Sequence, residues 1–334
     1  MPRYRNSFGF ACLIVFGGAI VSAAQVAPAP SLKPGEKAEI LFAAEAPRTE
    51  KDDKGKPALA SLEPIAFLVN GQFRECYAVG GPANAEGAVS KSVLGKLNLA
   101  YTRGRRYPVW WRGAPWGEAE AVHSCMDQDL DLTGCFRLHS ATADAAVPRD
   151  LNGIAFTGEL PEGSHPALRM KASPQERGVF LDAAVAAFAE QHVHTLRSRV
   201  HLDAVWKTQL RANHDALAGN ALVQIPTGKP RIYRSYRLFL VLEEEGAQYR
   251  SVLASFHKTR ITLDSGEDPP KAGQEMDEEN GADKELFFDN FPLFAGEPDA
   301  VISRHTYYED WNFSVHRRIG AKYQLVYSGC GGGA

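Results

Sequence analysis

Ile65-Ala66-Phe67-Leu68-Val69-Asn70-Gly71-Gln72-Phe73-Arg74-Glu75-Cys76 places an Asn-Gly pair between two β-prone runs. Asn70 and Gly71 tolerate the positive φ angles of a tight type I′ turn, so this segment predicts a β-hairpin. Residues 36–160 around it are expected to form an N-terminal β-rich domain with one helix. Further strands are predicted at Ala38–Ala43, Tyr107–Trp111, Ala119–Ser124, Phe136–Ser140 and Gly153–Thr157.

Two segments have the features of helices. Apolar residues recur at every fourth position from Val89 to Tyr101, shortly before Gly104. Ser173-Pro174-Gln175-Glu176 combines an N-cap serine, a proline suited to the first turn and a capping-box glutamate. The second helix is expected to run to about Thr195, within a connecting segment of residues 173–197.

The C-terminal part of the chain again has the alternation of β-strands. Two similar aromatic hairpins are predicted, one around Gly246 and one around Gly320. Residues 198–328 are therefore expected to form a C-terminal β domain of two degenerate repeats. The acid-rich stretch 264–285 is interpreted as a solvated loop, and Gly329–Gly333 as a flexible tail. The predicted fold class is α+β, mostly antiparallel β with two or three helices.

The first 24 residues have the three parts of a secretory signal. Arg3 and Arg5 precede an apolar run from Phe8 to Val21, and small residues follow up to Ala24. The alternative is a transmembrane anchor, but the run is short and two glycines interrupt it. We therefore expect cleavage after Ala23 or Ala24, a flexible arm at residues 25–35, and a periplasmic or secreted product that is not an integral membrane protein.

Export would leave four cysteines in an oxidising compartment: Cys76, Cys125, Cys135 and Cys330. Four cysteines allow three sets of pairs. Cys125–Cys135 is favoured, because the strands that flank this pair could be the two arms of one hairpin. Cys76–Cys330 would then follow by elimination.

Charge and motifs exclude several classes of function. The formal net charge is −3, so the chain lacks the excess of basic residues that nucleic-acid binding requires. Gly-x-Ser-x-Gly, His-Glu-x-x-His, Cys-x-x-Cys and Gly-x-Gly-x-x-Gly are all absent. The sequence thus assigns no catalytic residue, no cofactor and no metal ligand.

Two groups of residues are candidate ligands for metal ions. His192 and His194 could share zinc with His201 or Asp203 if they lay on a strand, but they fall at the end of the second predicted helix, where side chains two positions apart diverge. Asp127-Gln128-Asp129-Leu130-Asp131 begins like a calcium loop, yet its sixth position is leucine. Structural roles are the favoured interpretation of both.

Trp110, Trp111 and Trp116 could form a ligand-binding surface. Neighbouring strand residues face opposite sides, so Trp110 and Trp111 cannot both lie in the core. The outward one, together with Trp116, could stack on sugar rings, while burial of the aromatic rings is the competing interpretation.

The C-terminal half resembles VCBS/FG-GAP-like repeat segments of uncharacterised exported bacterial proteins. The resemblance rests on the helix from Ser173, the hairpin from Tyr307 to Val326, and the glycine-rich end. The family's turns hold calcium with several aspartates, whereas this chain has only Asn213-His214-Asp215 and Gly296-Glu297-Pro298-Asp299. The resemblance implies degenerate repeats that have lost their ion sites, and no known activity.

These observations favour a non-catalytic exported protein that binds an unknown protein or a polysaccharide surface. One alternative is an exported hydrolase whose site is assembled from dispersed His, Asp and Glu residues. Another is a structural domain stabilised by an ion.

Overall fold

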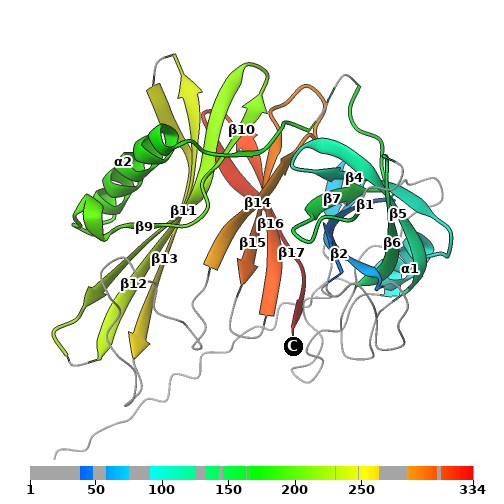
Figure 1. The fold of residues 1–334 in the computed structure, drawn as a ribbon, viewed down its shortest axis with the longest axis horizontal. Helices are drawn as coiled ribbons and strands as arrows, with labels where there is room; N and C mark the ends of the chain where they lie inside the picture. The colour runs from blue at the N-terminus through cyan, green and yellow to red at the C-terminus, as the bar shows by residue number, and fades with distance from the viewer. Residues whose placement is uncertain are drawn as a thin grey trace, which may run out of the picture.

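The computed structural model consists mainly of antiparallel β-sheet, with two α-helices among the residues that it describes (Figure 1). The mostly antiparallel β architecture predicted from the sequence is thus confirmed. The described residues are 38–47, 58–74, 91–124, 133–142, 146–162, 164, 166–229, 231–246, 248–262, 284–306 and 310–333.

The first seven strands form one antiparallel sheet. They are β1 (Ala38–Glu45), β2 (Ala60–Val69), β3 (Gln72–Arg74), β4 (Arg106–Trp111), β5 (Ala114–Ser124), β6 (Gly134–Ser140) and β7 (Asn152–Phe156). The strand order is β1-β7-β4-β5-β6-β2-β3, and an additional pairing of β1 with β2 closes six of the strands into a barrel. Asn70 and Gly71 adopt φ angles of 52° and 73° between β2 and β3, which confirms the predicted hairpin.

Helix α1 (Lys91–Ala100) and the barrel share an aromatic core. Phe42 of β1 is fully buried, and its ring lies 6.0–6.5 Å from those of Tyr101, Tyr107 and Phe136. The strands predicted between residues 36 and 160 are therefore present, and they converge on one interior.

A second sheet follows the barrel along the chain. Its strands are β8 (Met170–Lys171), β9 (His201–Leu202), β10 (Trp206–Arg211), β11 (His214–Pro226), β12 (Ile232–Glu245) and β13 (Gln248–Thr262). The order is β13-β12-β11-β10-β8, with β9 paired to β11. A short 3-10 turn at Arg197–Arg199 precedes β9.

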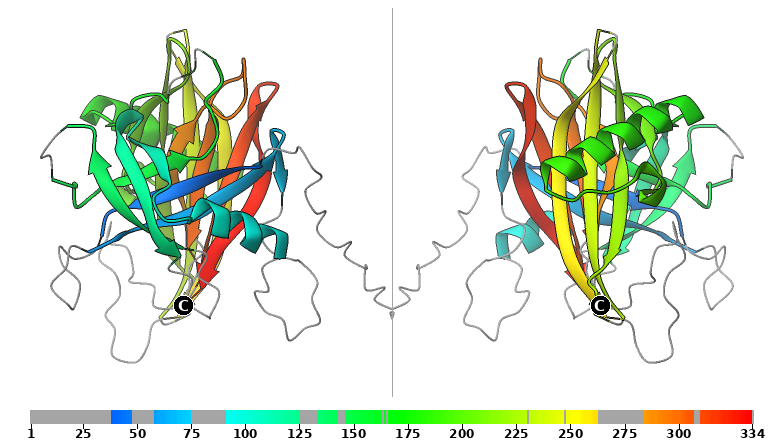
Figure 2. Two further views of the ribbon diagram at one scale, coloured as in Figure 1. Left: turned by 90° about the vertical axis from the view of Figure 1, so that its right-hand side faces the viewer. Right: turned by 90° about the vertical axis from the view of Figure 1, so that its left-hand side faces the viewer.

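Helix α2 (Pro174–Glu190) packs across the outer face of this sheet (Figures 1 and 2). The predicted capping box is present, with Ser173 accepting from the Glu176 amide and Glu176 accepting from the Ser173 amide. The helix ends earlier than predicted, because His192 adopts a left-handed φ of 59° and Val193 donates its amide to the Phe188 carbonyl.

The third sheet has the order β14-β15-β16-β17. Its strands are β14 (Lys284–Phe291), β15 (Ala300–Thr306), β16 (Asp310–Ile319) and β17 (Lys322–Gly333). Both hairpins predicted around Gly246 and Gly320 are present, as β12–β13 and β16–β17, but they belong to different sheets.

Two predictions about this third sheet are wrong. Gly331 and Gly333 pair with Asn312 and Asp310, so the glycine-rich end is the last part of a strand and not a free tail. Backbone amides and carbonyls supply these ladder bonds, and glycine has both. The solvated acidic loop predicted for 264–285 cannot include its last two residues, because Lys284 and Glu285 lie in β14 and Glu285 is almost fully buried. Residues 264–283 lie outside the described residues.

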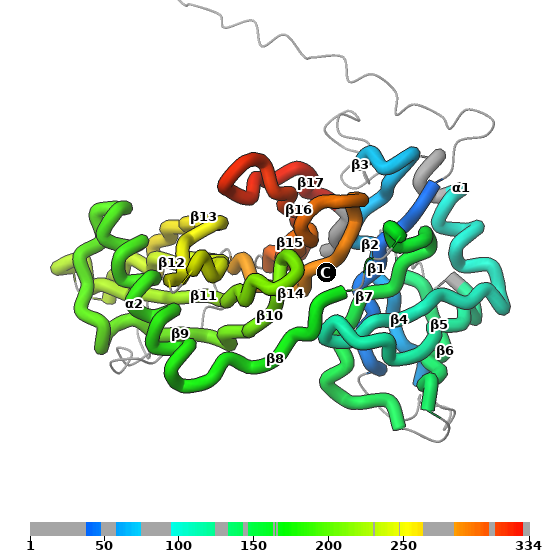
Figure 3. Tube along the Cα trace, turned by 90° about the horizontal axis from the view of Figure 1, so that it is seen from above, coloured from blue at the N-terminus to red at the C-terminus, as the bar shows by residue number. Residues whose placement is uncertain are grey.

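The four-stranded sheet lies between the barrel and the six-stranded sheet (Figures 1 and 3). One of its faces contributes Phe288, Phe291 and Phe313 to the core of the barrel. Its other face contributes Phe287 and Val301 to a core shared with the six-stranded sheet. The two predicted β domains are therefore joined by continuous packing.

Within the described part of the chain, neither helix has the length and apolar character that crossing a bilayer requires. The predicted signal segment 1–24 and the arm 25–35 lie outside the described residues.

Candidate metal-binding site

The space between the six-stranded and four-stranded sheets is apolar at one end and polar at the other. Three strands carry a Ser-x-His tripeptide there: Ser255–His257 on β13, Ser303–His305 on β15 and Ser314–His316 on β16. Residues two apart on a strand face the same side, so each tripeptide directs a hydroxyl and an imidazole to one face.

Glu285 of β14 lies at the centre of this polar end. It pairs directly with His305 across the β14–β15 ladder, which puts both side chains on the same face. Its Oε1 atom lies 3.1 Å from Nε2 of His316 and 3.4 Å from Nε2 of His305. Its Oε2 atom lies 3.3 Å from Nε2 of His257, which comes from the opposite sheet. One buried carboxylate thus contacts three imidazoles.

Two further groups hold this carboxylate in position. The Ser303 hydroxyl donates to Oε1 at 2.7 Å, and the Asn220 side chain donates to the backbone carbonyl of Glu285. Burial by itself raises the pKa of Glu285, but hydrogen bonds from His257, His305 and His316 outweigh it and hold this pKa far below its usual range. Glu285 is therefore ionised in the folded protein.

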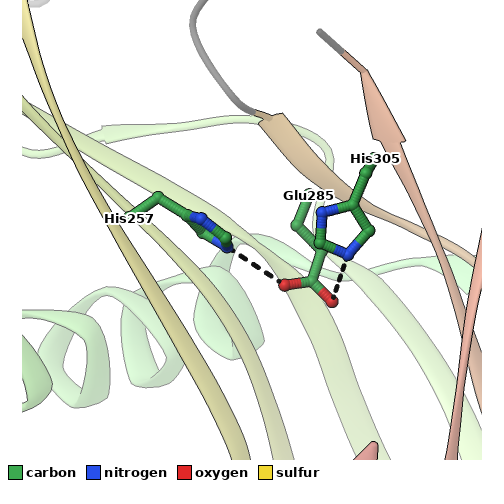
Figure 4. Close-up of side chains that lie close together, drawn as sticks. All are labelled: His257, Glu285 and His305. Carbon is green, nitrogen blue, oxygen red and sulfur yellow. Dashed lines mark hydrogen bonds and ion pairs between the residues drawn. The ribbon is translucent and has the colours of Figure 1, made fainter. Parts of the chain in front are cut away.

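His257, Glu285 and His305 have the arrangement of a metal-binding site. Their ligand atoms, two imidazole nitrogens and one carboxylate oxygen, all lie within 4.8 Å of one another. Figure 4 shows the two imidazoles directed at the carboxylate from opposite sides. Two histidines and one carboxylate form a common ligand set for zinc and other divalent transition metals, with further coordination positions left open.

The same contacts do not form a serine nucleophile triad. In such a triad the histidine uses one nitrogen for the serine and the other for the acid. Here Nε2 of His257 contacts both the Ser255 hydroxyl, at 3.0 Å, and Glu285. Nε2 of His316 likewise contacts both Ser303, at 3.2 Å, and Glu285. Neither serine is arranged for activation by a relay.

The three tryptophans predicted as a ligand surface are half-buried and pack against the barrel core. The Trp110 ring lies 5.3 Å from that of Phe291, at the contact with the four-stranded sheet. The guanidinium of Arg112 covers the Trp111 ring at 4.6 Å. Ligand binding by Trp110, Trp111 and Trp116 stays a prediction.

Of the other candidate residues in the described part of the chain, Asp203 borders the same small cavity as His257 and Glu285. His192 and His194 are exposed beyond α2, and His201 lies 3.6 Å from Asp203. The acidic run at 127–131 lies outside the described residues, as do Cys76 and Cys125 and the side chain of Cys330. Cys135 is in β6, and the predicted disulfide pairs stay predictions.

A second buried polar group connects β14 to the loop after it. The backbone amide of Asn290 donates to the Asp289 carboxylate at 3.0 Å, and the side-chain amide of Asn290 donates to the Asp299 carboxylate at 2.7 Å. Burial raises the pKa of Asp289 to about 6, despite the charge of Arg169, and the pKa of Asp299 to about 7. These contacts are directed within the protein, so the group is best explained as a structural network.

Sequence reasoning assigned no role to His257, Glu285 or His305. The repeated Ser-x-His pattern is visible in the sequence, and its period of two indicates one face of a strand. Glu285 gave no such indication, because it follows a run of acidic residues.

Comparisons of the chain with protein-family models, with curated proteins and with solved structures found no match.

Proposed function

We propose that the chain is an exported, non-catalytic binding protein whose site is built on a divalent transition-metal ion held by His257, Glu285 and His305. The observation that carries this proposal is the convergence of two imidazole nitrogens and one carboxylate oxygen within 4.8 Å. The three side chains come from the six-stranded and four-stranded sheets, which pack face to face as a sandwich, so a bound ion would connect β13 to β14 and β15.

The electrostatics of the cluster favour a cation. A buried carboxylate is costly unless charge and hydrogen bonds compensate it, and a divalent ion provides more compensation than imidazole hydrogen bonds alone. Nitrogen and oxygen donors suit zinc better than calcium or magnesium, which prefer oxygen ligands. His316 and Ser303 would then act as outer partners, because both donate to the carboxylate.

Zinc should bind to the metal-free protein and stabilise it. A ligand that binds only the folded state at 100 times its Kd adds about 2.7 kcal/mol to the free energy of unfolding. His257→Ala and His305→Ala should each lower zinc affinity by more than the roughly 100-fold that losing an outer partner can cost. Isothermal titration calorimetry and thermal unfolding, both after treatment with a chelator, measure these effects.

His194→Ala is the matched control, because this histidine is exposed and lies outside the cluster. It should leave zinc binding unchanged. Loss of binding in this variant, with binding retained in His257→Ala, would place the metal at the end of α2 and reject the proposed site.

Export is the second part of the proposal, and it is supported by the signal-like residues 1–24. It includes the predicted periplasmic or secreted location, the cysteine pairs and a partner that is a protein or a polysaccharide surface. We also propose that the β12–β13 and β16–β17 hairpins are degenerate repeats of the VCBS/FG-GAP-like kind.

Thiol titration of the mature protein, without reductant, should find no free cysteine or two. Closing the short loop between Cys125 and Cys135 would contribute about 2–3 kcal/mol by chain entropy, so reduction should lower thermal stability. Titration under denaturing conditions with and without reductant gives the count. Four free thiols would exclude both predicted bridges.

A further inference from the structure

Two neighbouring spaces lie beside the proposed metal site. The smaller one, which we call the inner cavity, has a volume of about 10 Å³ and is bordered by His257, Glu285 and Arg237. A larger cleft of about 330 Å³ is bordered by Trp206, Leu286 and Phe287. Asp203, Asn220, Lys284 and Leu286 border both spaces, so the cleft and the small cavity are neighbours.

The inner cavity has room for little more than one oxygen atom or one water molecule. Arg237 lies directly opposite His257 in the β12–β13 ladder, which places both side chains on the same face of the sheet. Arg237 is buried, with 6% of its surface exposed. A guanidinium therefore lies next to the imidazole that would bind the metal.

The charges around the cavity balance without a metal ion. Arg237 and Lys284 carry positive charge, whereas Asp203 and Glu285 carry negative charge. A divalent cation at the site would leave an excess of positive charge at the inner end. Anion binding in the cavity should therefore depend on the metal ion.

The outer cleft has a different character. Trp206, Leu286 and Phe287 give it an apolar wall, and its volume lies at the lower end of the range for small-molecule sites. The inner cavity thus offers a positively charged position for one oxygen atom, and the cleft offers an apolar wall for the rest of a ligand.

We propose that this cleft binds a small organic acid, with one carboxylate oxygen on the metal ion and near Arg237 and with the apolar body against Trp206 and Leu286. Carboxylates are favoured because guanidinium groups bind them through charge-assisted hydrogen bonds. Two histidines and one glutamate leave coordination positions open for such a ligand. This inference rests on the proposed metal site and identifies the class of its ligand.

The experiment uses the protein loaded with Co²⁺, whose visible absorption reports on its ligands. Benzoate is the probe, and benzamide is the neutral control of the same shape. Benzoate should change the Co²⁺ spectrum in a saturable way, at a concentration at least tenfold lower than benzamide requires. Arg237→Met should weaken the benzoate effect by at least tenfold while Co²⁺ still binds.

Lys284→Met removes a second positive charge at the cavity, at a less buried position than Arg237. It provides the test if Arg237→Met fails to fold. Lys229→Met, in an exposed turn, is the matched control for Lys284→Met. Lys284→Met should weaken benzoate binding, and Lys229→Met should not. Co²⁺ binding with a spectrum that benzoate leaves unchanged would overturn this inference and leave the metal site intact. Absence of Co²⁺ binding would overturn both the metal site and this inference. Benzoate binding of equal strength to the metal-free protein would show that the carboxylate does not bind to the metal ion.

Discussion

Glu285→Gln should destabilise the metal-free protein by about 3–5 kcal/mol at neutral pH, which is the cost of removing one partner from a buried charged network. The reason is the position of this carboxylate, which is almost fully buried and contacts His257, His305 and His316. Glutamine preserves the shape but replaces one acceptor oxygen with a donor, which would face imidazole donors. Urea unfolding with a chelator present measures the change.

The cost of Glu285→Gln should depend on pH. Hydrogen bonds from the histidines lower the pKa of Glu285 in the folded state, despite the opposing effect of burial. An acid with a lowered folded pKa stabilises the protein above its unfolded pKa, which is about 4.3 for glutamate, and this contribution is lost as the pH falls towards the folded value. The difference between wild type and variant should therefore be full near pH 7 and shrink below about pH 4.

Glu245→Gln provides the control. Its side chain is more than half exposed and forms a surface ion pair with Arg250 at 2.9 Å. Surface pairs of this kind contribute at most about 1 kcal/mol. Two results would show that the Glu285 carboxylate is not the centre of the network. One is a Glu285→Gln variant that is as stable as Glu245→Gln. The other is a stability difference between wild type and Glu285→Gln that stays constant down to pH 3.

Local elements of this fold could be predicted because their causes lie within a few residues. The turn at Asn70 and Gly71 needs only residues that tolerate positive φ, and the start of α2 needs only Ser173 and Glu176. The end of α2 was placed too late because His192, rather than glycine, adopts the left-handed C-terminal position.

The candidate site could not be predicted in the same way. His257 belongs to one sheet and Glu285 to another, so their contact depends on how two sheets pack and not on any spacing along the chain. The acidic residues before Glu285 favoured a solvated loop, whereas pairing with β15 buries it. The strand at the glycine-rich end was missed because its ladder with β16 uses backbone groups, which side-chain patterns do not report.

Phe291→Ala should destabilise the protein by about 3–5 kcal/mol, the usual cost of truncating a buried phenylalanine. Phe291 is fully buried at the end of β14. Its ring lies 5.3 Å from that of Trp110 and 5.9 Å from that of Phe156, both of which belong to the barrel. The space left by the missing ring would therefore lie at the contact between the barrel and the four-stranded sheet.

This variant also tests whether the two predicted β domains behave as one unit. Because a single apolar core includes barrel strands and β14–β17, urea should unfold both together in wild type, with the same midpoint by circular dichroism and by tryptophan fluorescence. Phe291→Ala should lower that shared midpoint, whereas Leu325→Ala, at a side chain that is 57% exposed, should change stability by no more than about 0.5 kcal/mol. Two separate transitions, with only one of them shifted by Phe291→Ala, would show that the barrel and the sandwich fold independently and that their contact contributes little to stability.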